Sequence, residues 1–184
     1  MNVKRGIVAI ACSAALGGLA WAQAPGGPPK PGPEHQKLGY FVGKWTTSGE
    51  MKPTGIPDMP SGKFTSKDTC EWFEGGFNVI CRSEGSMPTG PSKGLGIMGY
   101  NAEEKVYTYY AASNDPMNMA TVPHGTVQGD TWTYTDESKM GGKLIKSRYV
   151  IQVKTPTSYT FKWELQGSDG AWMTVMEGSS TKAS

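Results

Sequence analysis

Short runs of alternating apolar and polar residues follow one another along most of the chain after residue 43. In the clearest run, Tyr159, Phe161, Trp163 and Leu165 alternate with polar residues. Successive side chains of a strand point to opposite faces, so we expect one face of this segment to be buried and the other solvated. Segments rich in Gly, Pro, Asn and Asp separate the runs. The pattern predicts ten strands, at about residues 44–52, 62–73, 77–85, 94–100, 105–113, 117–127, 130–136, 143–153, 157–166 and 171–181.

The short connections between these strands favour an antiparallel up-and-down meander. An open sheet of this kind would leave two edges of unpaired backbone groups, and closure into a barrel removes both edges. Residues 34–184 have a length that suits one domain. We therefore predict an all-β fold: a single ten-stranded antiparallel up-and-down barrel over residues 34–184, preceded by a short N-terminal helix.

The helix is predicted in the segment PEHQKLGYFVGKW, residues 33–45. Leu38, Phe41 and Val42 have the spacing of one helical face, and Gly43 can end the helix. A helix this short is marginal in isolation, so it should pack on the barrel. We expect it to cover one open end, with Trp45 filling the bottom of the barrel.

The segment CEWFEGGFNVIC, residues 70–81, reads as a β-hairpin closed by Phe73 and Asn78. In this register three pairs face each other: Cys70 with Cys81, Trp72 with Val79, and Lys67 with Glu84. A disulfide, an apolar pair and an opposite-charge pair therefore fit one alignment. We predict a structural disulfide between Cys70 and Cys81. A redox or metal-binding pair is the alternative, but the sequence has no C-x-x-C motif and no histidine near these cysteines.

The first 24 residues have the features of a secretory signal peptide: basic residues Lys4 and Arg5, an apolar run, and the small residues Ala22 and Ala24 before the cleavage point. A lipoprotein signal at Cys12 is the alternative, although few apolar residues precede it. Residues 25–33 are rich in Pro and Gly and are predicted to form an extended tether. The mature protein should be secreted or periplasmic, and no later apolar run is long enough for an integral membrane segment.

Removal of residues 1–24 removes two basic residues and no acidic residue, and leaves 16 basic and 16 acidic residues. This balance gives no electrostatic reason to expect a nucleic acid or an anionic surface as partner.

Motifs for catalysis or cofactor binding are absent from the sequence, which contains no H-E-x-x-H, G-x-S-x-G or P-loop. We therefore predict no cofactor and favour a non-catalytic protein. Met117, Met119 and His124 offer two thioethers and an imidazole, soft ligands that suit Cu(I). The alternative, which we favour, is that these methionines fill irregular space in the core.

Aromatic residues are abundant and could line a barrel cavity that binds a small apolar or amphipathic molecule. The candidate ligand-binding residues are Trp72, Trp132, Tyr149, Phe161 and Trp163. The same rings could instead fill a solid core, because narrow barrels pack side chains across the lumen. Arg82 could anchor a ligand carboxylate, but the strand alternation places it on the outer face.

The segments LGYFVGKW, GGFNVICRSEG, GIMGYN, YTFKWEL and DGAWMTVMEGSSTK together resemble the bacterial family called domain of unknown function 1579, over about residues 34–182. This resemblance implies a lipocalin-like, calycin-type barrel and no established activity or catalytic residues. Gly43-Lys44-Trp45 is also similar to the G-x-W start of lipocalins and of nitrobindin-type haem barrels. TTSG replaces the glycine run of the latter, and no histidine follows His124 to ligate haem, so haem is not expected.

The leading functional hypothesis is a non-enzymatic module that binds a small apolar or amphipathic molecule in the barrel. A second hypothesis is an envelope protein with a solid core, whose Pro- and Met-bearing loops 53–61 and 86–93 contact a protein partner. A third is a weak enzyme with a carboxylate or tyrosine site in the barrel mouth.

Overall fold

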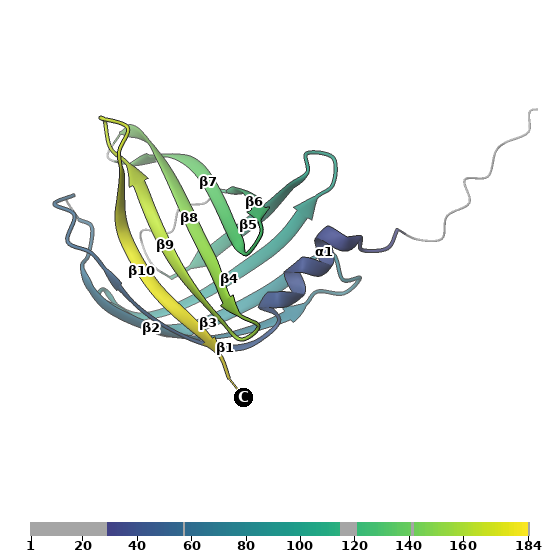
Figure 1. Ribbon diagram of the computed structural model, residues 1–184. Helices are drawn as coiled ribbons and strands as arrows, with labels where there is room; N and C mark the ends of the chain where they lie inside the picture. Colours follow the sequence, from purple (N-terminus) through teal and green to yellow (C-terminus); the bar gives the residue numbers. More distant parts are fainter. Residues whose placement is uncertain (1–28, 57, 115–120, 141, 184) are drawn as a thin grey trace, which may run out of the picture.

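A computed structural model describes residues 29–56, 58–114, 121–140 and 142–183. Within these residues ten antiparallel strands close into one barrel, in which each strand pairs with its sequence neighbours and β1 pairs with β10 (Figure 1). The strands are β1 (Gly43–Met51), β2 (Gly62–Trp72), β3 (Val79–Met87), β4 (Gly90–Asn101), β5 (Val106–Ser113), β6 (His124–Gln128), β7 (Thr131–Met140), β8 (Lys143–Thr155), β9 (Ser158–Gln166) and β10 (Trp172–Lys182). The predicted ten-stranded up-and-down barrel is confirmed.

Strand β4 begins at Gly90, four residues before its predicted start, and only Pro88 and Thr89 separate it from β3. The proline at position 91 suggested a loop, but the carbonyl oxygen of Pro91 accepts a hydrogen bond from Asn114 on the β5 side. An N–H group at position 91 would point to the same side as this carbonyl oxygen, toward β5. The pairing of β4 with β5 ends at Gly94, so the proline removes no hydrogen bond between strands. The segment 86–93 is therefore mostly strand and not the loop that we predicted.

Two other strand limits differ from the prediction by four residues or more. Strand β6 begins at His124 and not at residue 117, and residues 115–120 lie outside the described residues. Strand β7 continues to Met140, four residues beyond its predicted end, because it pairs along its whole length with β8.

The N-terminal helix is present as α1 (Pro33–Lys37) followed by the 3₁₀ turn η1 (Leu38–Phe41). Leu38 and Phe41 are buried, and the ring of Phe41 lies 5.1 Å from that of Trp132 on the inner face of β7. The φ angle of Gly43 is +131°, which favours glycine and lets the chain turn from the helix into β1. The helix and turn cover one end of the barrel, as expected (Figure 1).

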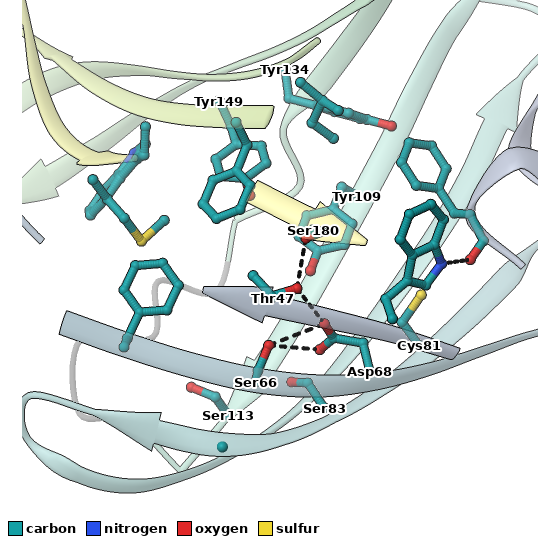
Figure 2. Close-up of a pocket in the computed structure, with 18 of the residues that line it drawn as sticks. Thr47, Ser66, Asp68, Cys81, Ser83, Tyr109, Ser113, Tyr134, Tyr149 and Ser180 are labelled. Atoms are coloured by element: carbon teal, nitrogen blue, oxygen red, sulfur yellow. Dashed lines mark hydrogen bonds between the residues drawn. The ribbon is translucent and has the colours of Figure 1, made fainter. Parts of the chain in front are cut away.

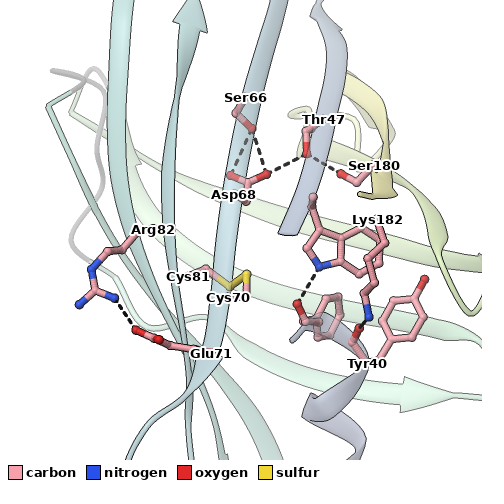
Figure 3. The surroundings of a disulfide bond; sticks show 12 residues. Tyr40, Thr47, Ser66, Asp68, Cys70, Glu71, Cys81, Arg82, Ser180 and Lys182 are labelled. Carbon is pink, nitrogen blue, oxygen red and sulfur yellow. Dashed lines mark hydrogen bonds and ion pairs between the residues drawn. A yellow bond between two sulfur atoms is a disulfide. The ribbon is translucent and has the colours of Figure 1, made fainter. Parts of the chain in front are cut away.

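The predicted hairpin and disulfide are confirmed. Cys70 faces Cys81 with a Cα–Cα distance of 4.0 Å, and the other two predicted pairs lie in the same register. The backbone N–H of Phe73 donates to the carbonyl oxygen of Asn78 at 2.8 Å and closes a four-residue loop. Arg82 is exposed on the outer face, where it pairs with Glu71 (Figure 3).

None of the helices in the described part of the chain combines the length and the apolar character needed to cross a membrane.

Candidate functional site

The inner face of β1 to β4 carries small side chains. The inward positions include Thr47, Gly49, Ser66, Ser83, Gly85, Ser92, Gly94 and Gly96. Side chains of this size cannot meet across a ten-stranded barrel, so they leave the lumen partly empty. A cavity of about 480 Å³ lies against these strands.

The opposite side of the cavity is aromatic. Tyr109 on β5, Tyr134 on β7, Tyr149 on β8, and Phe161 and Trp163 on β9 all line it. The rings of Tyr149 and Phe161 stack with centroids 5.6 Å apart, and those of Tyr109 and Tyr134 lie 6.1 Å apart. Each ring points inward because successive side chains of a strand alternate between the two faces of the sheet, and these residues occupy inner positions. One wall of the cavity is therefore mostly aromatic.

The bottom of the cavity is formed where the N-terminal turn enters the barrel. Phe41 and Trp45 line it there, and the indole Nε1 of Trp45 donates to the carbonyl oxygen of Phe41 at 2.7 Å. The disulfide between Cys70 and Cys81 lines the same region. The predicted position of Trp45 at the bottom of the barrel is confirmed.

A hydrogen-bonded group of polar residues faces the aromatic wall (Figure 2). The Asp68 carboxylate accepts hydrogen bonds from Thr47 Oγ1 at 2.9 Å and from Ser66 Oγ at 3.1 and 3.2 Å. Thr47 Oγ1 also lies 2.7 Å from Ser180 Oγ on β10. Because a hydroxyl has one hydrogen and Thr47 donates it to Asp68, Ser180 is the donor in this second bond. The hydroxyls of this network come from β1, β2 and β10, and together they fix the orientation of the Asp68 carboxylate.

Burial raises the pKa of Asp68, and the hydrogen bonds from Thr47 and Ser66 oppose this effect. Among the described residues, no lysine or arginine forms an ion pair with Asp68, although seven ion pairs occur elsewhere. Asp136 on β7 is the other carboxylate among the described residues that line the cavity. The described lining contains no Lys, Arg or His, so its side chains carry only negative formal charge.

The tyrosine hydroxyls in the cavity stay protonated at neutral pH. Burial raises the pKa of Tyr109, Tyr134, Tyr149 and Tyr159 above the ordinary value. They therefore act as neutral hydrogen-bonding groups and not as bases. The hydroxyl of Tyr134 is buried and has no hydrogen-bond partner in the structure.

Replacement of Tyr134 by phenylalanine is expected to leave the free energy of unfolding unchanged or to raise it by about 1 kcal/mol, because it removes an unpaired buried hydroxyl. Tyr107→Phe is the matched comparison: its hydroxyl donates to Glu34, so its loss should lower the stability by about 1 kcal/mol. Urea denaturation measures both variants. Equal destabilisation by the two substitutions would show that Tyr134 has a partner in solution.

Three of the five candidate ligand-binding residues, Tyr149, Phe161 and Trp163, line the cavity. Trp132 does not line it: it is 4% exposed at the covered end, between Phe41 and Tyr107. Trp72 is also outside the cavity, 38% exposed at the end of β2. The strand alternation places both side chains on the inner face of the barrel. They lie near the ends of their strands, however, where the N-terminal segment and not the cavity occupies the lumen.

The candidate copper ligands Met117 and Met119 lie outside the described residues, and His124 is exposed at the start of β6. In the ranges that the structure covers, no group of three or more His, Cys, Asp or Glu residues is placed to hold a metal ion. The sequence reasoning missed Thr47, Ser66, Asp68 and Ser180. Small polar residues at the inward phase of β1 to β4 were the signal that could have identified Thr47, Ser66 and Asp68, whereas Ser180 lies on β10.

Two solved structures share the barrel fold. Rv2717c from M. tuberculosis is 11% identical, with a TM-score of 0.56, and the match covers 83% of this chain and 99% of that chain. The S-type phycobiliprotein lyase CPES from Guillardia theta is 14% identical, with a TM-score of 0.57 and coverage of 82% and 93%. At these identities the likeness extends to the fold alone. No curated protein matches this chain.

The family resemblance in the sequence is confirmed over nearly the whole barrel. The family model described as "Protein of unknown function (DUF1579)" matches residues 30–182, which include the N-terminal helix and all ten strands. The protein therefore belongs to the DUF1579 family.

Proposed function

We propose that this protein is a non-catalytic binding protein that holds a small apolar or amphipathic molecule inside the barrel. The observation that carries this proposal is the cavity of about 480 Å³, with aromatic rings on one wall and a hydrogen-bonded carboxylate on the other. Its volume is in the range of small-molecule sites, which are mostly apolar with a few oriented polar groups. A solid core, the alternative that the sequence left open, does not account for this space.

The chemistry of the lining supports binding more than catalysis. Both cysteines near the cavity are joined in the disulfide, so neither offers a thiolate nucleophile. The tyrosine hydroxyls are held protonated by burial, so they serve as hydrogen-bonding groups. Asp68 is oriented by two hydroxyls, and its partners among the described residues include no histidine and no second carboxylate.

We also propose that the barrel is exported to the periplasm or beyond the cell, after cleavage of residues 1–24. The disulfide between Cys70 and Cys81 supports an oxidising compartment. Residues 1–28 lie outside the described residues, so the signal peptide and the start of the tether at 25–33 remain predictions from the sequence. An intact mass of the protein purified from its host tests them, since a mature chain that begins at residue 25 is expected and an uncleaved chain would contradict export by this signal.

The binding proposal is tested by filling the cavity. Ser83 lines it and points inward from β3, so Ser83→Phe should place a ring in the lumen and weaken binding of the neutral probe N-phenyl-1-naphthylamine at least tenfold. The measurement is the increase in probe fluorescence on titration with protein. Ser86→Phe is the matched control, because Ser86 is exposed on the same strand.

Three outcomes of this titration are informative. Loss of probe binding in Ser83→Phe, with binding retained in Ser86→Phe, would support a ligand site in the barrel. Equal binding by both variants would place the probe outside the cavity and contradict the proposal. Absence of probe binding to the unmodified protein would favour the scaffold hypothesis, in which loop 53–61 contacts a partner and the interior has no ligand.

A further inference from the structure

We propose that the cavity selects a cationic ligand, a small amine attached to an apolar body, whose ammonium group binds Asp68. This inference rests on the proposed binding function and adds the chemical class of the ligand. Three features of the cavity carry it: the sign of the charge on its lining, the unused hydrogen-bonding capacity of Asp68, and the aromatic rings that face Asp68.

The charge of the lining has one sign. Asp68 and Asp136 are the charged side chains among the described lining residues, and no Lys, Arg or His accompanies them. A carboxylate removed from bulk water is costly unless a cation or enough hydrogen bonds compensate it. A cationic ligand would supply this compensation, whereas an anionic ligand would meet like charge in a partly desolvated site.

Asp68 has accepting capacity that the protein leaves unused. A carboxylate has about four lone-pair sites. Thr47 donates to Oδ2, and the single hydrogen of Ser66 is shared between Oδ1 and Oδ2, so two hydroxyl hydrogens serve this carboxylate. About two acceptor sites therefore remain for a donor in the cavity. An ammonium group has three N–H donors and no acceptor, so it matches an acceptor that is already held in place.

The aromatic wall is compatible with a positive charge. The rings of Tyr109, Tyr149 and Phe161 line the same cavity as Asp68. The negative face of an aromatic ring attracts a cation within about 6 Å of its centre, and this attraction is stronger where water is excluded. The rings also pack against the apolar part of the ligand. A carboxylate opposite an aromatic wall therefore fits both ends of an apolar amine.

The experiment compares three probes of the same shape: 1-naphthylmethylamine, 1-naphthalenemethanol and 1-naphthoic acid, which are cationic, neutral and anionic at pH 7. Isothermal titration calorimetry measures their affinity for the mature protein. We expect the amine to bind at least tenfold more tightly than the alcohol, and the acid to bind most weakly. A charged hydrogen bond of ordinary strength corresponds to a tenfold to hundredfold effect.

Asp68→Asn removes the charge with little change in shape. It should lower the affinity for the amine at least tenfold and leave the affinity for the alcohol within about threefold, so the alcohol reports whether the site is still folded. Asp130→Asn is the control, because Asp130 is exposed in the turn between β6 and β7 and does not line the cavity. This control should bind all three probes like the unmodified protein.

The amine should also bind more weakly as the pH falls through the pKa of Asp68, which burial raises, because the protonated acid loses its charge. The titratable groups that face Asp68 across the cavity are Tyr109, Tyr149 and Tyr159, which are protonated throughout this range, and Asp136 also lines it. Because Asp68→Asn removes only one of the two carboxylates, it shows whether Asp68 or Asp136 causes the pH dependence. Loss of most of the pH dependence in this variant would assign it to Asp68.

The probes distinguish failure of this inference from failure of the proposed function. If the alcohol and the amine bind equally, or if the acid binds best, the cavity binds ligands but does not select cations, and the inference is wrong. If none of the three binds, the proposed binding function fails for ligands of this size, and the inference fails with it. If Asp68→Asn leaves the preference for the amine intact, the cation is held elsewhere.

Discussion

Replacement of Trp45 by alanine is expected to lower the free energy of unfolding by about 3–5 kcal/mol, the usual cost of removing a buried tryptophan. Trp45 is 2% exposed at the covered end of the barrel, and its ring lies 5.0 Å from that of Tyr159 and 5.6 Å from that of Tyr40. Its indole N–H also donates a hydrogen bond to the carbonyl oxygen of Phe41. The substitution therefore removes both the packing and the hydrogen bond that join the N-terminal turn to the strands.

Urea denaturation followed by far-UV circular dichroism measures this loss. Phe73→Ala is the control, because Phe73 is 55% exposed in the β2–β3 hairpin and its loss should change the stability by less than about 1 kcal/mol. If Trp45→Ala were no more harmful than Phe73→Ala, the N-terminal segment would contribute little to the closed barrel. The same variant should weaken probe binding, since Trp45 lines the bottom of the cavity.

Removal of the disulfide by the double substitution Cys70→Ala and Cys81→Ala is expected to lower the free energy of unfolding by about 3 kcal/mol. The bond closes a loop with a sequence separation of 11, and the chain-entropy model gives a value of about this size for loops of this length. The disulfide also lines the bottom of the cavity, and Cys70 is the next inward position after Asp68 on β2 (Figure 3). The loss should therefore extend to the binding site.

A reducing agent separates these two contributions. Dithiothreitol should lower the urea midpoint of the unmodified protein but leave the midpoint of the double variant unchanged. Mass spectrometry should show two free thiols after treatment with dithiothreitol. If the urea midpoint of this reduced protein were unchanged, a stabilising role for the disulfide would be contradicted. The hairpin register would still be held by its apolar and charged pairs.

The sequence was sufficient for the local features of the barrel. Alternation with a period of two identified all ten strands, and the pairing of Cys70 with Cys81 followed from Phe73 and Asn78 as the pair that closes the hairpin. It was less reliable at strand limits. The Pro and Gly residues of 86–93 suggested a loop. A proline is tolerated in a strand where its missing N–H does not face a neighbouring strand, and at Pro91 that depends on where β5 ends.

The sequence by itself determined which side chains point inward, because that depends only on the alternation along each strand. It did not determine which inward residues share the cavity. Trp132 has the same inward phase as Tyr134, yet the first is covered by Phe41 and the second lines the space. The packing of rings at the covered end depends on the position of the helix and turn. The alternation within the strands does not predict that position.

The contacts that Thr47 makes with Asp68 and Ser180 were decided by tertiary structure alone. Thr47 and Ser180 are 133 residues apart and meet because closure of the barrel places β1 beside β10. Thr47 and Asp68 meet through the neighbouring pairing of β1 with β2. Alternation fixes the direction of each side chain relative to its own strand, whereas a binding site depends on distances between strands, and those are set by strand number, register and closure.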